Sequence, residues 1–571
     1  MSAWIDAAMP QLIVAPIVLP LVTAALLLLV NESRRGAKAL ISIVATAAVL
    51  VVAIALMQWV VRHATASAVG VYLPSNWQAP FGIVLAVDRL SAMMLVLTGV
   101  IGLASLLFAT ARWHRAGVHY HSLFQLQLMG INGAFLTADL FNLFVFFEVM
   151  LAASYGLLLH GSGRARVGAG LKYIAVNLLA SSLFLIGVAI VYGITGTLNY
   201  ADIAQKIALV PAADRGLLHA GAALLGIAFL AKAAMWPLNF WLTPAYSAAS
   251  ASAAALFVVL TKVGVYTVLR LWTLLLAAEA GAAVWFGADA LVYGGLATLA
   301  FGAIGVVASH RLRRTAGFAV IISSGTLLAA IGLGHATLVG GALFYLLGST
   351  LAVSALFLLI ELIERTGEFE TAPPVYDDAA DHAPLYLAAG EHVAHAPAES
   401  GDAPLVGKAI PAATAFLGLS FMTCALLIAG LPPLSGFLAK FAMLSALLDP
   451  AGVDAGATGS AIPAAHWSLL ALLIGSGLLS IIGLSRAGAR HFWAPQGRPA
   501  PHLRVIECLP IAALLALCAL LALRAGPVLD YAEAAAAAVI DPTRYVQAVM
   551  SATPVPPPGD RPVHAARMPT P

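Results

Sequence analysis

Fourteen apolar stretches, each close to the length that a helix needs to cross a lipid bilayer, constrain this chain more than any other feature. They lie near residues 10–30, 38–61, 86–110, 121–137, 140–160, 171–193, 219–243, 248–276, 289–308, 315–333, 338–363, 410–448, 467–486 and 507–524. A membrane helix takes about 20 apolar residues, and none of these stretches alternates with the period of two that a membrane strand requires. Only 10% of the 571 residues are charged, against about a quarter in soluble domains. The sequence therefore predicts an all-α polytopic membrane protein.

The lysines and arginines are distributed unevenly between the two sides of these predicted helices. If the N-terminus lies outside, the inner loops contain seventeen of them: Arg34, Arg35, Lys38, Arg112, Arg115, Arg164, Arg166, Lys172, Arg311, Arg313, Arg314, Arg365, Lys408, Arg486, Arg490, Arg498 and Arg504. The outer loops contain four: Arg62, Arg89, Lys206 and Arg215. Basic residues accumulate in cytoplasmic loops. We therefore expect a multi-pass protein of a bacterial inner membrane with both termini on the outer side.

Two of the predicted helices are interrupted at matching places. The interrupting residues are Pro237 in the stretch 219–243, and Pro432, Pro433 and Gly436 in the stretch 410–448. Each interrupted helix is the fourth in a group of five, and an odd number of helices inverts the second group relative to the first. We therefore expect three N-terminal helices (1–120), a first repeat (121–277), an inverted second repeat (289–486) with an acidic cytoplasmic loop (366–408), and a last helix with a tail (507–571) that is disordered from about residue 551.

Four charged residues lie deep inside apolar stretches: Glu148, Lys232, Lys262 and Lys440. A lysine at the centre of a membrane helix costs roughly 2.5 to 3.5 kcal/mol on insertion scales, so such residues usually face a bundle interior or a water-filled path. The structural alternative is a lysine that snorkels to the membrane surface, or a glutamate that only neutralises one lysine. Because all four residues lie far inside their stretches, we interpret them as functional.

The chemistry of these groups suits a proton pathway. Burial favours the neutral form of both a carboxylic acid and an amine, while a nearby opposite charge favours the ionised forms. Separating Glu148 from Lys232 would therefore make the lysine release its proton. Lys262, with Tyr266 one turn further along the helix, would receive that proton, and Lys440 would accept it next.

Other groups are weaker candidates. Lys172 lies at the inner end of the stretch 171–193, where it either snorkels to the interface or takes part in proton entry. Asp88 and Arg89 are expected to form a solvated pair at the start of a helix. The histidines of the acidic loop are interpreted as solvated, and no nucleotide, flavin or haem motif is present. We therefore expect no catalytic residue, metal, cofactor or nucleic-acid partner.

Several of these stretches resemble a known family. The resemblance lies in the segments LFNLFVFFEVMLAASYGLLLHG, AFLAKAAMWPLNFWL, LFVVLTKVGVYTVLRL and AGLPPLSGFLAKF. They are similar to the antiporter-like membrane subunits shared by respiratory complex I and the multisubunit Mrp cation/proton antiporters, and most similar to the D subunits of the Pha-type K⁺/H⁺ branch. The resemblance covers roughly residues 10–525. It implies a fourteen-helix fold with two inverted five-helix repeats.

The resemblance also implies roles for particular residues. Glu148, Lys232, Lys262 and Lys440 match the family's charged residues in the fifth, seventh, eighth and twelfth helices. Ser323 stands where several complex I relatives have a histidine, so a central proton path would here use serine and water. The acidic loop is longer than usual for the family, and we assign it no role.

Taken together, the residues and the resemblance predict a proton-translocating subunit of a multisubunit K⁺ or Na⁺/proton antiporter that contributes to pH and cation homeostasis. It would be a transporter subunit and no enzyme, working beside the other hydrophobic subunits A, C, E, F and G. One alternative is a proton-pumping subunit of a redox complex, such as complex I or a hydrogenase, without a redox cofactor of its own. Another is a secondary transporter that acts alone.

Overall fold

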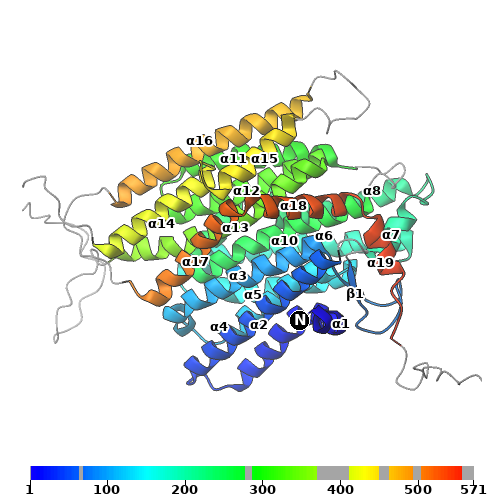
Figure 1. The fold of residues 1–571 in the computed structure, drawn as a ribbon, viewed down its shortest axis with the longest axis horizontal. Coiled ribbons are helices and arrows are strands. Elements are labelled where there is room, and N and C mark those ends of the chain that lie inside the picture. Colours follow the sequence, from blue (N-terminus) through cyan, green and yellow to red (C-terminus); the bar gives the residue numbers. More distant parts are fainter. Residues whose placement is uncertain are drawn as a thin grey trace, which may run out of the picture.

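The computed structural model describes residues 2–63, 69–276, 286–368, 411–448, 462–492 and 503–555. Its long helices lie side by side along the long axis of the molecule and form one bundle (Figure 1). They are α1 (Ser2–Leu29), α2 (Arg35–Arg62), α3 (Arg89–Ala111), α4 (Tyr120–Leu136), α5 (Leu140–Leu159), α6 (Arg164–Thr195), α8 (Arg215–Lys232), α10 (Ala251–Leu275), α11 (Ala288–Ala308), α12 (Leu312–Leu333), α13 (Ala336–Glu368), α14 (Ala412–Ala429), α15 (Ser435–Leu448), α16 (Ala464–Phe492) and α17 (Val505–Leu523).

The predicted spans are confirmed as helices. Thirteen helices of the described residues are long and apolar enough to cross a membrane. α4 has 17 residues and occupies the remaining predicted stretch. Both interrupted stretches are also interrupted in the structure, because α8 is followed by the short α9 (Leu242–Ala248) and α14 by α15. The protein is therefore a multi-pass helical membrane protein.

Polar side chains begin several of the long helices. The carboxylate of Asp88 accepts the Ser91 backbone N–H at the start of α3, and that of Asp139 accepts the Asn142 N–H at the start of α5. Ser250 caps α10 in the same way. Such side chains satisfy backbone donors that have no partner inside the helix. The starts of these three helices thus follow from polar side chains that the sequence places at or near the start of the apolar stretches.

α10 is the central helix of the bundle. Every one of its residues is buried, and it packs against α3, α8, α12 and α13. An α-helix that is covered on all sides exposes no face to lipid, so a charged residue in it must be satisfied inside the protein. Lys262, in the middle of α10, therefore lies at the centre of the bundle.

Several smaller elements at one end of the bundle were not predicted. β1 (Gly70–Tyr72) pairs antiparallel with β2 (Leu85–Val87). The helices α7 (Tyr200–Ile207) and α19 (Thr543–Met550) pack together near this hairpin (Figure 1). α18 (Ala525–Ile540) packs against α13. The sequence places the disordered, proline-rich end from about residue 551, and the two helices before it, α18 and α19, were not predicted.

Two predicted segments extend beyond the described residues. The sequence predicts an acidic loop at 366–408. Residues 366–368 end α13, and residues 369–408 lie outside the described residues. Of the proline-rich end, residues 551–555 follow α19, and 556–571 lie outside the described residues.

Candidate functional site

The first helix break lies directly after Lys232. α8 ends at this lysine and α9 begins at Leu242, so Pro237 lies inside the break, as predicted. The break keeps its backbone satisfied: the Trp236 N–H donates to the Thr298 hydroxyl on α11 at 2.8 Å, and the Trp241 indole donates to the Ala231 carbonyl at 3.1 Å. Irregular backbone at membrane depth requires such internal partners. The break is therefore stabilised by the helices around it and belongs to the regular fold.

Lys232 and Glu148 are connected through α6 and do not pair directly. Lys232 is 6% exposed, and its Nζ donates to Asn177 Oδ1 at 2.9 Å. Ser181, one turn further along α6, donates its hydroxyl to Glu148 Oε1. The sequence predicts that the glutamate and the lysine are brought together. In the structure each charge instead has its own hydrogen-bond partner on α6, the Asn177 amide for the lysine and the Ser181 hydroxyl for the glutamate.

An aromatic ring completes the surroundings of Lys232. Its Nζ lies 5.9 Å from the ring centroid of Phe147, the residue before Glu148. Phe147 in turn packs edge-on against Phe184 and Phe229. A desolvated ammonium is stabilised by the face of an aromatic ring. The aromatic residues around Glu148 therefore do more than pack helices, because one of them also contacts the cation.

Lys262 has a serine as its hydrogen-bond partner. The side chain is fully buried, and its Nζ donates to the Ser323 hydroxyl on α12 at 2.7 Å. Ser323 also shares a hydrogen bond of 3.0 Å with Ser349 on α13. Tyr266 does not join this chain of hydroxyls, since it donates to the Phe135 carbonyl on α4 at 2.7 Å. Two serines thus connect the central lysine with the second half of the bundle.

Lys440 points into the second helix break. The break holds Pro432 and Pro433 between α14 and α15, whereas Gly436 lies in the first turn of α15 and not in the break, in contrast to the expectation. Lys440, 6% exposed, donates to the carbonyl of Ala429, the last residue of α14, at 2.9 Å. The negative end of a helix dipole favours a cation at this point.

Gly436 and Gly430 have packing roles at this break. A Cβ on Gly436 would lie 2.0 Å from the Leu427 carbonyl oxygen, so only glycine allows α15 to approach the end of α14. Gly430 ends α14 with a φ of 78°, and a Cβ there would lie 2.7 Å from Cδ of Lys440. The two glycines therefore leave room for α15 and for the lysine side chain at the end of α14.

The three lysines predicted for the proton path have separate hydrogen-bond partners. Lys232 donates to Asn177, Lys262 to Ser323 and Lys440 to backbone carbonyls. Lys172 lies apart from all of them, exposed on α6 at one end of the bundle. Each of the three lysines thus has its own hydrogen-bond acceptor, at a separate place in the bundle.

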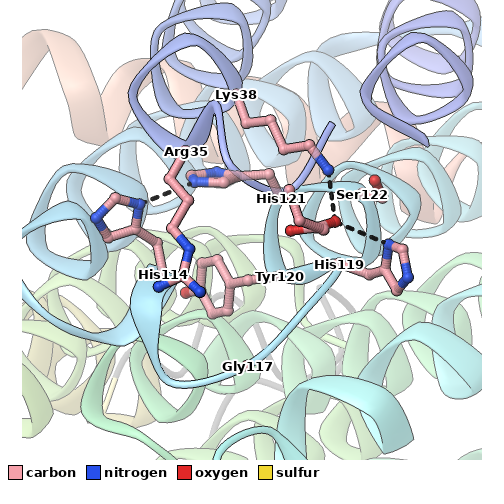
Figure 2. A pocket seen from close by; sticks show the side chains of 9 residues that line it. Arg35, Lys38, His114, Gly117, His119, Tyr120, His121 and Ser122 are labelled. Carbon is pink, nitrogen blue, oxygen red and sulfur yellow. Dashed lines mark hydrogen bonds and ion pairs between the residues drawn. The ribbon is translucent and has the colours of Figure 1, made fainter. Parts of the chain in front are cut away.

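A polar cluster that no sequence pattern indicated lies where α1 joins α2 and α3 joins α4 (Figure 2). Lys38 is 4% exposed and donates to Glu32 at 2.5 Å, and His119 lies 3.3 Å from the same oxygen. Nε2 of His121 lies 3.5 Å from Nδ1 of His114. The hydrogen bond from Lys38 lowers the pKa of Glu32, and burial lowers the pKa of His114. The cavity between them measures about 10 Å³, which is the space of one water molecule.

A buried ion pair was also missed. Asp88 was expected to form a solvated pair with its neighbour Arg89, and this is wrong: Asp88 Oδ2 lies 2.6 Å from Nη2 of Arg270 on α10, and both side chains are less than a tenth exposed. No sequence signal near Asp88 pointed to a partner 182 residues away.

Gly264 lets α10 contact the backbone at Lys232, and a substitution there should disturb the site. A Cβ would lie 2.5 Å from the backbone nitrogen of Ala233 and 2.8 Å from the carbonyl carbon of Lys232. Gly264→Ala is therefore expected to destabilise the protein by roughly 1–3 kcal/mol, the usual cost of overpacking, and to weaken the contact of Lys232 with Asn177. The unfolding midpoint of the purified protein measures this effect.

The matched control is Gly193→Ala in α6, where a Cβ would have no atom within 4 Å. Alanine is the better helix former by about 1 kcal/mol, so this variant should be neutral or more stable. Equal stability of both variants would contradict the assigned role of Gly264.

Comparisons with known proteins show the family of this chain. A family model described as "NADH:quinone oxidoreductase/Mrp antiporter, TM" matches residues 137–378. The chain is 50% identical, over 97% of its length and 99% of the relative's, to the D subunit of a probable K⁺/H⁺ antiporter of Rhizobium meliloti (strain 1021). It is 32% identical, over 95% of its length and 100% of the relative's, to the D subunit of the Na⁺/H⁺ antiporter of Alkalihalophilus pseudofirmus.

A solved structure has the same fold. The chain superimposes on a chain of the Mrp complex from Dietzia sp. DQ12-45-1b with a TM-score of 0.74, at 26% identity, covering 95% of this chain and 99% of that chain. Both curated names denote transporter subunits. The chain therefore belongs to the family of D subunits of multisubunit cation/proton antiporters.

Proposed function

We propose that this protein is the proton-translocating subunit of a multisubunit monovalent cation/proton antiporter in a bacterial inner membrane. The observation that carries the proposal is the placement of Lys232 and Lys440 at two helix breaks, with Lys262 fully buried between the two halves of the bundle. Exchange of protons for K⁺ or Na⁺ would contribute to pH and cation homeostasis. The names of the relatives support this assignment and leave both cations open.

The first step of the proposed mechanism takes place at Lys232. Glu148 would stabilise the charged lysine through Asn177 and Ser181, which lie one turn apart on α6. A shift of the α8 break relative to α6 would remove Asn177 as an acceptor. Because a buried ammonium without partners is unfavourable, Lys232 would then give up its proton to neutral Lys262 through water along the central axis.

The proton would continue along the hydroxyl chain of α12 and α13. Lys262 is already bound to Ser323, which contacts Ser349. Hydroxyls both donate and accept, so they pass a proton along without carrying a lasting charge. At the far end, Lys440 would accept the proton where the carbonyl of Ala429 favours the ammonium.

The chain's orientation in the membrane, its repeats and its partner subunits complete this assignment. We infer that residues 121–277 and 289–486 form inverted repeats, supported by the two breaks at matching positions. We also infer that both termini lie on the outer side, supported by the distribution of lysines and arginines. We also infer that the chain works beside subunits A, C, E, F and G of the same complex. Lys172 and Tyr266 remain secondary candidates for proton entry and relay.

The test is cation-induced proton movement in everted vesicles from a bacterium that lacks its own antiporters. The intact operon should let K⁺ or Na⁺ collapse the pH gradient, and Lys232→Ala should abolish this response. Glu148→Gln should do the same, because it removes the charge that stabilises the lysine. The control is Lys206→Ala, which alters a lysine 40% exposed at the end of the bundle and should leave transport intact.

Two outcomes would contradict the proposal. If an assembled complex responds to neither cation, the antiporter assignment fails and a redox-driven pump becomes the better interpretation. If this chain alone gives full transport, the multisubunit assignment fails.

A further inference from the structure

A basic cavity of about 640 Å³ opens at the end of the bundle where α6 and α12 begin. Side chains from five parts of the fold line it: the start of α6, α9, the α11–α12 connection, the end of α13 and the end of α16. Its charged lining residues are Arg164, Lys172, Arg311, Arg313, Arg314 and Glu364. None of these residues has a role in the proposed proton path except Lys172, as a secondary candidate.

The positive charges in this basic cavity are largely uncompensated. Glu364 is its one carboxylate, and it pairs with Arg313 at 2.5 Å. The side chains of Arg164, Arg311 and Arg314 make no hydrogen bond or ion pair with any residue that the structure describes, and all three are exposed. Like charges held at one cavity repel one another. An anion that binds between them would relieve this repulsion.

The preference of cytoplasmic loops for basic residues does not account for this arrangement. That preference fixes only the side of the membrane on which arginines lie. Here arginines from two connections far apart in sequence, at 164 and at 311–314, face the same cavity. The fold has therefore gathered them at one point.

The lining residues select phosphate as the ligand chemistry. Arginine offers a planar group of donors that binds phosphate oxygens in pairs, and it stays charged at every physiological pH. Lys172 adds a mobile point charge. A phosphate ester with one or two negative charges matches this set of donors.

The surface beside the basic cavity favours a lipid as the source of that phosphate. Lys172, Leu179 and Ile186 are spaced by seven residues and so share one face of α6. Leu179 is 63% exposed and Ile186 is 50% exposed. An apolar stripe thus begins at the cavity and runs along a helix that crosses the membrane. A phospholipid would place its headgroup among the arginines and its acyl chains along this stripe.

We propose that the basic cavity binds the headgroup of an anionic phospholipid whose acyl chains lie against the exposed face of α6. This binding does not depend on the transport mechanism, because the experiment that tests it measures lipid binding and not transport.

The test uses the assembled complex with the full-length chain, purified in neutral detergent and freed of lipid. Dioleoyl phosphatidylglycerol is added stepwise, and the apparent Kd is read from the rise of the unfolding midpoint. The variant is Arg311→Gln with Arg314→Gln, and the control is Arg34→Gln with Arg112→Gln, two exposed arginines that do not line the cavity. Arg311→Lys with Arg314→Lys keeps the charge and tests the need for arginine.

Loss of two cavity arginines should weaken phosphatidylglycerol binding about 25-fold, since each basic residue near the surface contributes about fivefold. The control should change it by less than about twofold, and the lysine variant should bind at an intermediate strength. Equal weakening in both double glutamine variants would overturn the proposal in favour of general surface attraction. A matching shift with phosphatidylcholine would also overturn it, and so would a full shift with inorganic phosphate alone, which would identify a soluble anion as the ligand.

Discussion

Lys262→Met is expected to abolish cation-driven proton movement in everted vesicles while the complex remains assembled and stable. Lys262 is fully buried and donates to Ser323. Methionine fills a similar volume without a charge, and replacing a buried charge by a well-packed apolar side chain is often neutral or stabilising. The loss of transport would therefore come from the missing proton carrier and not from a damaged fold.

Lys262→Arg separates the charge of the residue from its ability to release a proton. Arginine keeps the positive charge and does not deprotonate in proteins. If Lys262 carries protons, the arginine variant should be as inactive as the methionine variant. Ser323→Ala should slow transport only in part, because Ser349 remains within the same hydroxyl chain. Normal transport by Lys262→Arg would contradict the proposed role of Lys262.

The main elements of this structure could be predicted because they follow from local physics. A stretch of about 20 apolar residues has few stable solutions in a membrane other than a helix. A proline inside such a stretch removes a backbone donor, which is why the breaks at Pro237 and at Pro432–Pro433 were visible in the sequence. The cost of a buried lysine marked Lys232, Lys262 and Lys440 in the same way.

The partners of these charges could not be predicted because they depend on tertiary packing. Asn177 and Ser181 look like ordinary polar residues of a membrane helix, and only the approach of α5 and α8 to α6 gives them their charged neighbours. The helices α18 and α19 follow the last span and carry no membrane signal of their own. The basic cavity is likewise formed by arginines whose loops meet only in the folded protein.

Asp88→Asn is expected to be among the most destabilising single substitutions outside the proton path. It removes the negative charge beside Arg270, which is only 6% exposed and also lies over the rings of Tyr266 and Tyr545. Leaving one partner of a buried ion pair uncompensated costs about 3–5 kcal/mol. The free energy of unfolding, measured by SDS titration in mixed micelles, should fall by about this amount.

Asparagine is chosen because it begins a helix as well as aspartate does, so the cap on the Ser91 N–H is kept and only the charge is lost. The matched control is Asp139→Asn, which changes the cap of α5 in the same way at a residue without an ion pair among the described residues; it should alter stability by less than about 1 kcal/mol. Adding Arg270→Met to Asp88→Asn should recover most of the loss, because the isolated cation is then gone. If the single substitution costs no more than the control, the pair does not hold α3 against α10. If the second substitution only adds to the loss, Arg270 stabilises the fold through the two tyrosines rather than through Asp88.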